Sequence, residues 1–332
     1  MARTHHRIVA LETFFCPLPK FDACFPASHT FEVKEYARTK VSEIPERIRD
    51  ADILVMTVIP IRADVLSEAV SPNLKMIGVV ASGTDSVDLE ACKKRGIHVA
   101  NTPHCNATAV AEHAIASYFA ARRSITLTHS LARSGEWPKR GTLLKTMDGP
   151  NGKPPMTCGS ETMGIMGYGA VGKKIESVAK ALGMKVLISA RKGAPAGKGR
   201  TDFNTVIRES SVIVMCLPRT PETLNMISEP ELDAMPNYSV LVNVSRGGMV
   251  DEKALVAALR AKKIAGAATD VFLQEPASPE TSPLLAPDTA DLNLVTTPHV
   301  AWCAEDTTDN YNESLKKNVS SWLEGAPTNK VV

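Results

Sequence analysis

Residues 167–172 are Gly167-Tyr168-Gly169-Ala170-Val171-Gly172. These residues form a G-x-G-x-x-G pattern, with an apolar strand expected before it at 162–166 and an amphipathic helix after it at 173–182. A second strand is expected at 185–189. In such a strand–helix–strand unit the glycines form a tight turn, admit a pyrophosphate and let helix and strand pack closely. The pattern therefore predicts a dinucleotide-binding fold, with the anion at the N-terminus of the helix.

The end of the second expected strand carries the signal for the choice of cofactor. NAD enzymes usually place Asp or Glu there, about 20 residues past the glycines, to bind the ribose 2′-hydroxyl. Here the strand ends at Ser189 and Ala190, and Arg191 and Lys192 follow. Arginine suits a 2′-phosphate through its planar, bidentate donors, whereas an exposed basic turn is the structural alternative. The residues favour NADP(H), with NAD(H) as the alternative cofactor.

The composition excludes several classes of protein. The 332 residues suffice for two domains, and 44% hydrophobic with 22% charged residues is typical of a soluble globular protein. A net charge of +2 without a long basic run argues against a nucleic-acid partner. The seven cysteines are scattered without a C-x-x-C pair, so we expect neither a metal site nor disulfides. Because no apolar run has membrane length and the N-terminus lacks a signal-peptide core, we expect a cytoplasmic protein.

Expected strands and helices alternate along the chain, which predicts parallel sheets with helices on both faces. In the first hundred residues, strands are expected at 8–11, 31–34, 53–58, 75–80 and 98–100, and helices at 41–49, 63–69 and 89–95. A long helix at 107–131 and an exposed loop at 141–160 follow. The remaining strands are expected at 212–217, 239–244, 266–269 and 292–296, and the remaining helices at 252–260 and 305–323.

The order of these elements predicts two domains. An α/β domain precedes the glycine motif, and a helical tail follows the domain that contains it. The tail helix must bury its apolar face, and the simplest arrangement returns it to the first domain. We therefore expect a discontinuous, flavodoxin-like substrate-binding domain of residues 1–101 and 299–332. Residues 102–298 would form a Rossmann domain, both sheets would be doubly wound, and a ligand cleft would lie between the domains.

Three polar residues follow late strands: Arg246, Glu275 and His299. The carboxyl ends of strands in a doubly wound sheet face the cofactor. Hydride transfer to a 2-keto acid requires a proton for the carbonyl oxygen, and histidine suits that role. A carboxylate on its other nitrogen would fix the tautomer, and an arginine could bind the substrate carboxylate. Taken singly, a histidine after a Thr-Pro turn and an arginine before two glycines are more often structural or surface residues.

Ordered blocks of sequence resemble the D-isomer-specific 2-hydroxyacid dehydrogenase family over nearly the whole chain. Besides the glycine motif, they are GTDSVDL (83–89), GIHVANTP (96–103), AVAEH (109–113), LP (217–218), ET (222–223), NVSRGGMVDE (243–252), AATDVF (267–272), EP (275–276) and TPHVAW (297–302). The resemblance implies two α/β domains, a nicotinamide cofactor and a homodimer formed through the nucleotide domain. The family's usual NAD-type Asp is Ala190 here.

The resemblance also implies roles for individual residues. The catalytic set would be Arg246, Glu275 and His299. Backbone N–H groups around Ser82 and Gly83 would hold the substrate carboxylate, so that Ser82 and Gly83 bind substrate together with Arg246 and His299. The residues expected along the cofactor, besides the glycine motif and the basic pair, are Asp270, near the nicotinamide amide, and Leu217, Pro218 and Thr223.

The expected function is the NADP(H)-preferring reduction of a small 2-keto acid, of the glyoxylate or hydroxypyruvate type, to the D-2-hydroxy acid, and the reverse reaction. Trp302, after the histidine, resembles glycerate dehydrogenases and hydroxypyruvate reductases within the family. Formate dehydrogenase is one alternative, but it carries Gln where Glu275 stands, because its substrate has no proton to relay. A dinucleotide-sensing corepressor is another alternative, and its relatives retain the Arg/Glu/His set.

Overall fold

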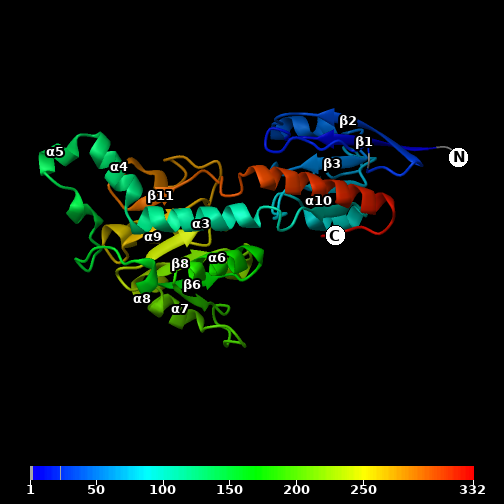
Figure 1. The fold of residues 1–332 in the computed structure, drawn as a ribbon. Coiled ribbons are helices and arrows are strands. Elements are labelled where there is room, and N and C mark those ends of the chain that lie inside the picture. The colour runs from blue at the N-terminus through cyan, green and yellow to red at the C-terminus, as the bar shows by residue number, and fades with distance from the viewer. Residues whose placement is uncertain (1–2, 23) are drawn as a thin grey trace. The chain divides into compact units, whose positions relative to one another are not determined.

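The computed structural model of the protein describes residues 3–22 and 24–332. Contacts between Cα atoms divide the chain into two compact units. Unit 1 comprises the described residues up to Asn106 together with Cys303–Val332, and unit 2 comprises Ala107–Trp302. Each unit contains one parallel sheet with helices, which confirms the predicted α/β class (Figure 1).

The sheet of unit 1 has five parallel strands in the order β2-β1-β3-β4-β5. This order is that of flavodoxin-like folds. The inner strands β3 and β4 are buried along their whole length, as expected for strands covered on both faces. All five strands overlap strands expected from the sequence, although the first begins four residues earlier than expected. Their bounds are β1 (Thr4–Ala10), β2 (His29–Glu35), β3 (Ile53–Met56), β4 (Met76–Val79) and β5 (His98–Asn101).

The helices of unit 1 come from both ends of the chain. The tail helix α10 (Glu305–Leu323) packs on β4 and β5, where Gly78 leaves room for Leu315 because a Cβ there would lie 2.8 Å from the leucine side chain. Helix α2 begins after Asp88, whose side chain accepts the Ala91 N–H at 2.9 Å. Besides α10, the helices of this unit are η1 (Val41–Glu43), α1 (Ile44–Ile48) and α2 (Leu89–Arg95).

The prediction of a helix at 63–69 is wrong, because this segment forms a series of turns. The Ser67 hydroxyl donates to the Asp64 carbonyl at 2.8 Å, and the Ser71 hydroxyl donates to the Val65 carbonyl at 3.0 Å. Serine side chains that bond to nearby backbone groups compete with helical hydrogen bonding. The apolar residues Val65 and Leu66 are therefore buried by these turns rather than by one face of a helix.

The sheet of unit 2 has six parallel strands in the order β11-β10-β9-β8-β6-β7. Strands β7 and β8 lie on opposite sides of β6, the strand that precedes the glycine motif. Ligands of such sheets bind at the carboxyl ends of the strands where the strand order reverses in this way. The bounds are β6 (Thr162–Met166), β7 (Lys185–Ile188), β8 (Val212–Met215), β9 (Val240–Asn243), β10 (Gly266–Thr269) and β11 (Leu294–Thr296).

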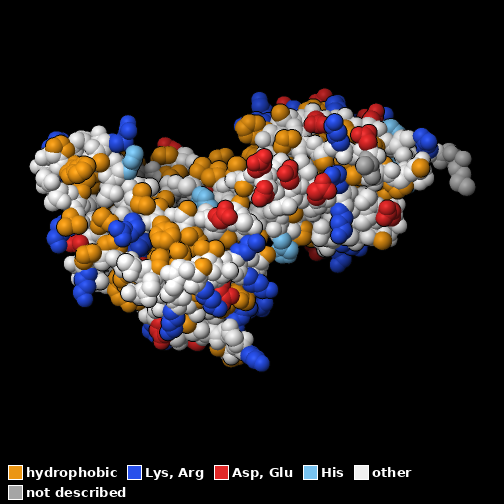
Figure 2. All heavy atoms as spheres, in the orientation of Figure 1, with side chains coloured by type: hydrophobic (Ala, Val, Ile, Leu, Met, Phe, Trp, Pro, Cys, Tyr) orange, Lys and Arg blue, Asp and Glu red, His pale blue; other side chains and the backbone are white. Residues whose placement is uncertain are grey.

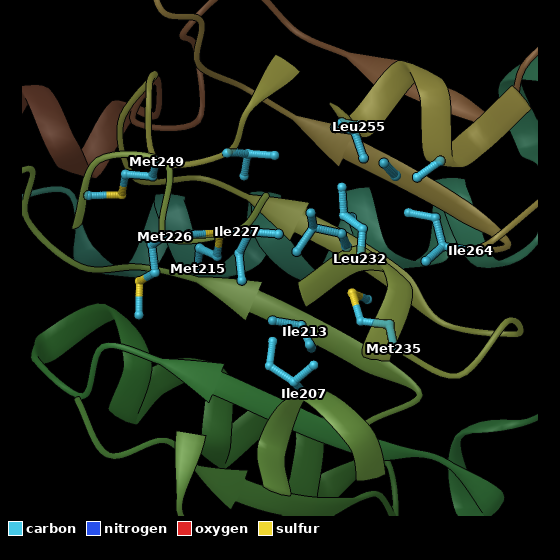
Figure 3. Packing of buried hydrophobic residues seen from close by; sticks show 14 of the residues in the cluster. Ile207, Ile213, Met215, Met226, Ile227, Leu232, Met235, Met249, Leu255 and Ile264 are labelled. Atoms are coloured by element: carbon cyan, nitrogen blue, oxygen red, sulfur yellow. The ribbon is translucent and has the colours of Figure 1, made fainter. Parts of the chain in front are cut away.

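Helices cover both faces of this sheet. Successive side chains of β8 alternate between the faces: Val212 joins the buried cluster beneath α3 and α6, and Ile213 joins the cluster beneath α7, α8 and α9. Figure 3 shows Ile213 close to Ile207, with Leu232 and Leu255 in the same cluster. The bounds are α3 (Ala107–Arg122), α6 (Ala170–Ala181), α7 (Phe203–Glu209), α8 (Glu229–Ala234) and α9 (Glu252–Arg260).

The long helix expected at 107–131 is broken into two. Helix α3 ends at Arg122, and α4 (Ile125–Arg133) begins after Ser124, whose φ is 47°. The break is fixed by Arg122, which is buried, pairs with Glu161 at 2.7 Å and donates to the Tyr238 carbonyl at 2.6 Å. Short helical turns follow in and around the loop expected at 141–160, and these are α5 (Glu136–Arg140), η2 (Leu144–Met147) and η3 (Cys158–Ser160).

Three further turns of 3₁₀ helix lie near the carboxyl half of unit 2, at η4 (Pro221–Thr223), η5 (Pro283–Leu285) and η6 (Pro287–Thr289). Each begins with a proline, whose fixed φ suits the first position of a helical turn. Across residues 3–22 and 24–332, no helix is long and apolar enough to cross a membrane.

Candidate active site

The three glycines of the motif are required for different reasons. Gly167 has a φ of 96°, and a Cβ there would overlap the Cys216 carbonyl oxygen. A Cβ on Gly172 would overlap the Gly167 carbonyl oxygen, so the third glycine permits the close packing of α6. A Cβ on Gly169 would meet nothing within 4 Å. The space beside the second glycine, at the N-terminus of α6, therefore fits the approach of a pyrophosphate.

The two cations expected to select the cofactor differ in their surroundings. The Lys192 ammonium lies 2.8 Å from a Glu231 carboxylate oxygen and donates to the Met226 carbonyl at 3.0 Å, so its charge is already balanced. Arg191 is exposed, and its charge contributes to the lowered pKa of Glu222, which is caused mainly by a hydrogen bond from Thr220. Of the two, Arg191 is the better candidate for binding a phosphate.

Strands β9, β10 and β11 are neighbours in the sheet, and Arg246, Glu275 and His299 follow them in that order. The structure brings two of these side chains into direct contact, because His299 Nδ1 lies 2.6 Å from Glu275 Oε2. An ionised carboxylate only accepts hydrogen bonds, so Nδ1 carries the hydrogen. Nε2 is then the nitrogen left for a substrate. The Phe272 N–H holds the other carboxylate oxygen at 2.9 Å.

The charge state of Glu275 follows from its contacts. Burial raises its pKa, but the hydrogen bond and charge of His299, the Phe272 N–H and the charge of Arg246 together lower the pKa below its usual value. Glu275 is therefore ionised at neutral pH. The side chains of His299 and Glu275 are 36% and 32% exposed, so the pair is accessible to a ligand.

The loop that carries His299 is held by Asp270, which is 2% exposed. One Asp270 oxygen accepts the Thr297 hydroxyl at 2.6 Å and the Val300 N–H at 2.9 Å, and the other accepts the Ala301 N–H at 2.9 Å. The His299 N–H also donates to the Asp270 carbonyl at 2.8 Å. His299 has a φ of 55°, a conformation that strains a residue with a Cβ. These contacts hold the strained backbone in place.

Arg246 is positioned by the loop after β9. The Asn243 side chain donates to the Arg246 carbonyl at 3.1 Å, and the arginine Nη1 donates to the Ser245 carbonyl at 2.8 Å. A Cβ on Gly247 would overlap the Phe272 carbonyl oxygen. Only glycine therefore allows this loop to lie against the segment after β10, where Glu275 stands.

The remaining residues expected along the cofactor lie after β8. The Thr223 hydroxyl donates to the Pro218 carbonyl at 3.1 Å and accepts the Thr220 N–H at 2.8 Å, which folds this loop back on itself. Leu217 stands at the start of the loop, beside the position where a Cβ on Gly167 would lie. Leu217, Pro218 and Thr223 thus follow the strand next to β6, at the reversal of strand order.

Ser82 and Gly83 belong to unit 1 and follow β4. The Asn101 side chain donates to the Ser82 carbonyl at 2.7 Å, and the Ser82 hydroxyl donates to the Asn106 side-chain oxygen at 3.0 Å. These bonds fix the backbone at the carboxyl edge of the unit 1 sheet.

Two residues beside the glycine motif, Tyr168 and Arg200, were assigned no role from the sequence. The guanidinium carbon of Arg200 lies 4.8 Å from the centre of the Tyr168 ring. An aromatic residue between the first two glycines was visible in the sequence. The position of Arg200 was not, because it depends on how the chain returns to the sheet after β7.

Among the described residues, no group of three His, Cys, Asp or Glu side chains could hold a metal ion.

Comparison with known proteins identifies the family. Residues 115–301 match the family model described as D-isomer specific 2-hydroxyacid dehydrogenase, NAD binding domain. The chain is 40% identical over 302 residues to a glycerate dehydrogenase of Methylorubrum extorquens, covering 90% of this chain and 92% of that one. It is 35% identical over 289 residues to a glyoxylate reductase of Thermococcus litoralis, covering 84% and 83% of the two chains.

A solved structure is similar over nearly the whole length. The NADPH-dependent glyoxylate/hydroxypyruvate reductase of Sinorhizobium meliloti, in complex with NADP and malonate, has a TM-score of 0.77 and 26% identity. The similarity covers 98% of this chain and 97% of that chain. The protein therefore belongs to the D-isomer-specific 2-hydroxyacid dehydrogenase family. It is an oxidoreductase that acts on small molecules with a nicotinamide dinucleotide cofactor.

Proposed function

We propose that the protein reduces a small 2-keto acid of the glyoxylate or hydroxypyruvate type to the D-2-hydroxy acid, with NADPH as the preferred cofactor, and catalyses the reverse reaction. The observation that carries this proposal is the pair of His299 and Glu275, 2.6 Å apart, on a sheet edge that also bears Arg246. The names of the glycerate dehydrogenase and glyoxylate reductase relatives support the choice of substrate class.

Each residue has a distinct part in this reaction. A nicotinamide cofactor, when bound, would supply the hydride for reduction of the substrate carbonyl. His299 donates the proton on Nε2 to the carbonyl oxygen, which becomes the hydroxyl. Glu275 holds Nδ1–H and balances the imidazolium. Arg246 binds the substrate carboxylate and draws electron density from the carbonyl. In unit 1, the backbone N–H groups around Ser82 and Gly83 are the proposed substrate-binding groups.

Binding of the cofactor involves the residues after β6, β7 and β8. The turn from Gly167 to Gly172, with Ala170 and Val171 at the start of α6, binds the pyrophosphate through backbone N–H groups. Arg191 binds the 2′-phosphate, and Ala190 removes the carboxylate that would repel it. Lys192 stands next to Arg191 in the chain, but its charge is balanced by Glu231, so Arg191 is the main proposed ligand of this phosphate. The other contacts would come from Leu217, Pro218 and Thr223, and the nicotinamide amide would lie near Asp270.

A substrate panel tests the proposal. Glyoxylate, hydroxypyruvate and longer 2-keto acids are each mixed with NADPH or NADH, and the loss of reduced nicotinamide is followed by its absorbance. We expect the highest kcat/KM for a two- or three-carbon keto acid with NADPH. Formate oxidation without keto-acid reduction would establish the formate dehydrogenase alternative. Cofactor binding without turnover of any substrate would favour the dinucleotide-sensing alternative.

We also propose a homodimer formed through unit 2. Large apolar side chains are exposed along the segment from α4 to η2: Ile125 is 50%, Trp137 is 59% and Leu144 is 62% exposed. Figure 2 shows orange side chains on the part of unit 2 formed by α4 and α5. Exposed apolar groups in one region are typical of a subunit interface. Light scattering should give twice the chain mass, and Trp137→Glu should shift the protein towards the mass of a single chain.

A cytoplasmic location is the last part of the proposal. All seven cysteines are unpaired thiols. Burial raises the pKa of Cys16 and of Cys92 to about 11, so both are unreactive at neutral pH. Unpaired thiols suit a reducing compartment. Cell fractionation should place the protein with soluble cytoplasmic markers, and recovery in an oxidising compartment would contradict this location.

A further inference from the structure

Tyr168, between the first two glycines of the motif, is held by its hydroxyl. The hydroxyl donates a short hydrogen bond to Glu176 on α6, and Glu176 in turn pairs with Lys180 at 2.8 Å. The tyrosine ring is therefore fixed beside the turn that precedes α6. A fixed aromatic ring can hold a guanidinium group that stacks on it.

Arg200 is brought to this ring by the chain segment that returns after β7. Thr201 forms a parallel bridge with Ser189, its N–H donates to the Ile188 carbonyl at 2.7 Å, and its carbonyl accepts the Ala190 N–H at 2.7 Å. These bonds dock the residue after Arg200 onto the end of β7. They place Arg200 beside the strand end after which the ribose of a dinucleotide is recognised.

The charges around this strand end favour a phosphate. Arg191 and Arg200 reach it from two different segments, and both residues are exposed. Within residues 3–22 and 24–332, no carboxylate oxygen pairs with Arg200 inside 4.0 Å, in contrast to Lys192, which pairs with Glu231. The guanidinium carbon lies over the Tyr168 ring, 4.8 Å from its centre. The N–H donors at the edge of a guanidinium can bind two oxygens of one phosphate in a bidentate manner.

We propose that Arg200 is a second ligand of the 2′-phosphate, held in place by the Tyr168 ring, and that with Arg191 it forms a clamp of two arginines. This inference rests on the proposed preference for NADPH. Contact with the tyrosine already restricts the rotamers of Arg200. Less conformational entropy is therefore lost when this side chain binds a ligand. Arg200 therefore contributes to the choice of cofactor and has no part in hydride or proton transfer.

Calorimetric titration of the full chain tests the proposal by equilibrium binding. The ligands are NADPH, NADH, adenosine 2′,5′-bisphosphate and adenosine 5′-monophosphate, and the last two isolate the effect of the 2′-phosphate. Arg200→Ala should weaken NADPH and the bisphosphate about tenfold or more, since a charge-assisted contact is lost, and leave NADH and the monophosphate within about twofold. Arg200→Lys should lose less, because it keeps the charge without the planar fork.

Lys198→Ala is the matched control, because Lys198 is an exposed cation two residues earlier in the same turn. It should leave all four dissociation constants within about twofold, so that loss of net charge alone is excluded as the cause. An equal loss of NADH and NADPH in Arg200→Ala would assign the arginine to the adenine and overturn the inference. Unchanged NADPH binding would overturn it too.

The same titrations separate this inference from the proposed cofactor preference. If the unmodified protein binds NADPH more tightly than NADH and Arg191→Ala reduces only NADPH binding, the preference stands whatever Arg200→Ala does. If the unmodified protein binds both cofactors equally, the preference itself fails, and the role of Arg200 fails with it.

Discussion

At the carboxyl edge of the unit 2 sheet, the residues after β10 and β11 are held differently from those after β7. His299 is fixed by Glu275 at its ring and by Asp270 at its backbone, and Asp270 is almost fully buried. Arg191 and Arg200 are exposed, and Arg200 is held by stacking on one ring. Proton transfer requires a preorganised group, whereas recognition of a phosphate requires cationic donors that an incoming ligand can reach.

The largest effect is expected at His299, where hydrogen bonds hold both the ring and the backbone. His299→Ala should lower kcat for keto-acid reduction by about 10²–10⁴-fold, because a positioned acid contributes that much. Binding of NADPH should be unchanged. Steady-state kinetics and calorimetry measure the two quantities. His5→Ala, which removes an exposed histidine on β1, is the control and should keep full activity. A His299→Ala rate within about threefold of the parent would place the proton donor elsewhere.

An intermediate effect is expected at the end of β7. Arg191→Ala should weaken NADPH about tenfold, because a charge-assisted contact to phosphate is lost, and should leave NADH nearly unchanged. The measurement is the ratio of the two dissociation constants. Arg208→Ala, an exposed arginine on α7, serves as the control for charge alone. Equal weakening of both cofactors would show that Arg191 does not read the 2′-phosphate.

The smallest effect is expected on stability. The pKa of Glu275 is lowered in the folded protein, so its contribution to stability is present above the pKa of an unfolded glutamate, near 4.3. This contribution is lost as the pH falls through the lowered pKa. Glu275→Gln should therefore lower Tm at pH 7 by a few degrees and by less at about pH 3. A difference in Tm that is constant across this range would mean that the charge of Glu275 does not stabilise the fold.

Much of the fold and part of the site could be predicted from the sequence. The pattern of apolar residues predicted a segment that overlaps each strand. Because Glu275 and His299 follow late strands in the sequence, both were expected at the carboxyl edge of the sheet. The break at Ser124 could not be predicted, because it depends on the burial of Arg122 against Glu161, 39 residues later. Likewise, the ion pair between Lys192 and Glu231 could not be predicted from the sequence. Contacts between distant segments, rather than local pattern, decided these positions.

The pH dependence of kcat/KM for keto-acid reduction, measured in the unmodified protein and in Glu275→Gln, shows whether Glu275 and His299 act together in proton transfer. Reduction requires the protonated imidazole, so activity should fall on the alkaline side in both proteins. Glutamine keeps the shape of the side chain and removes its charge, so the protonated imidazole loses the carboxylate that stabilises it. The alkaline limb of the variant should therefore move to lower pH, and a limb that stays where it is in the unmodified protein would contradict the pairing.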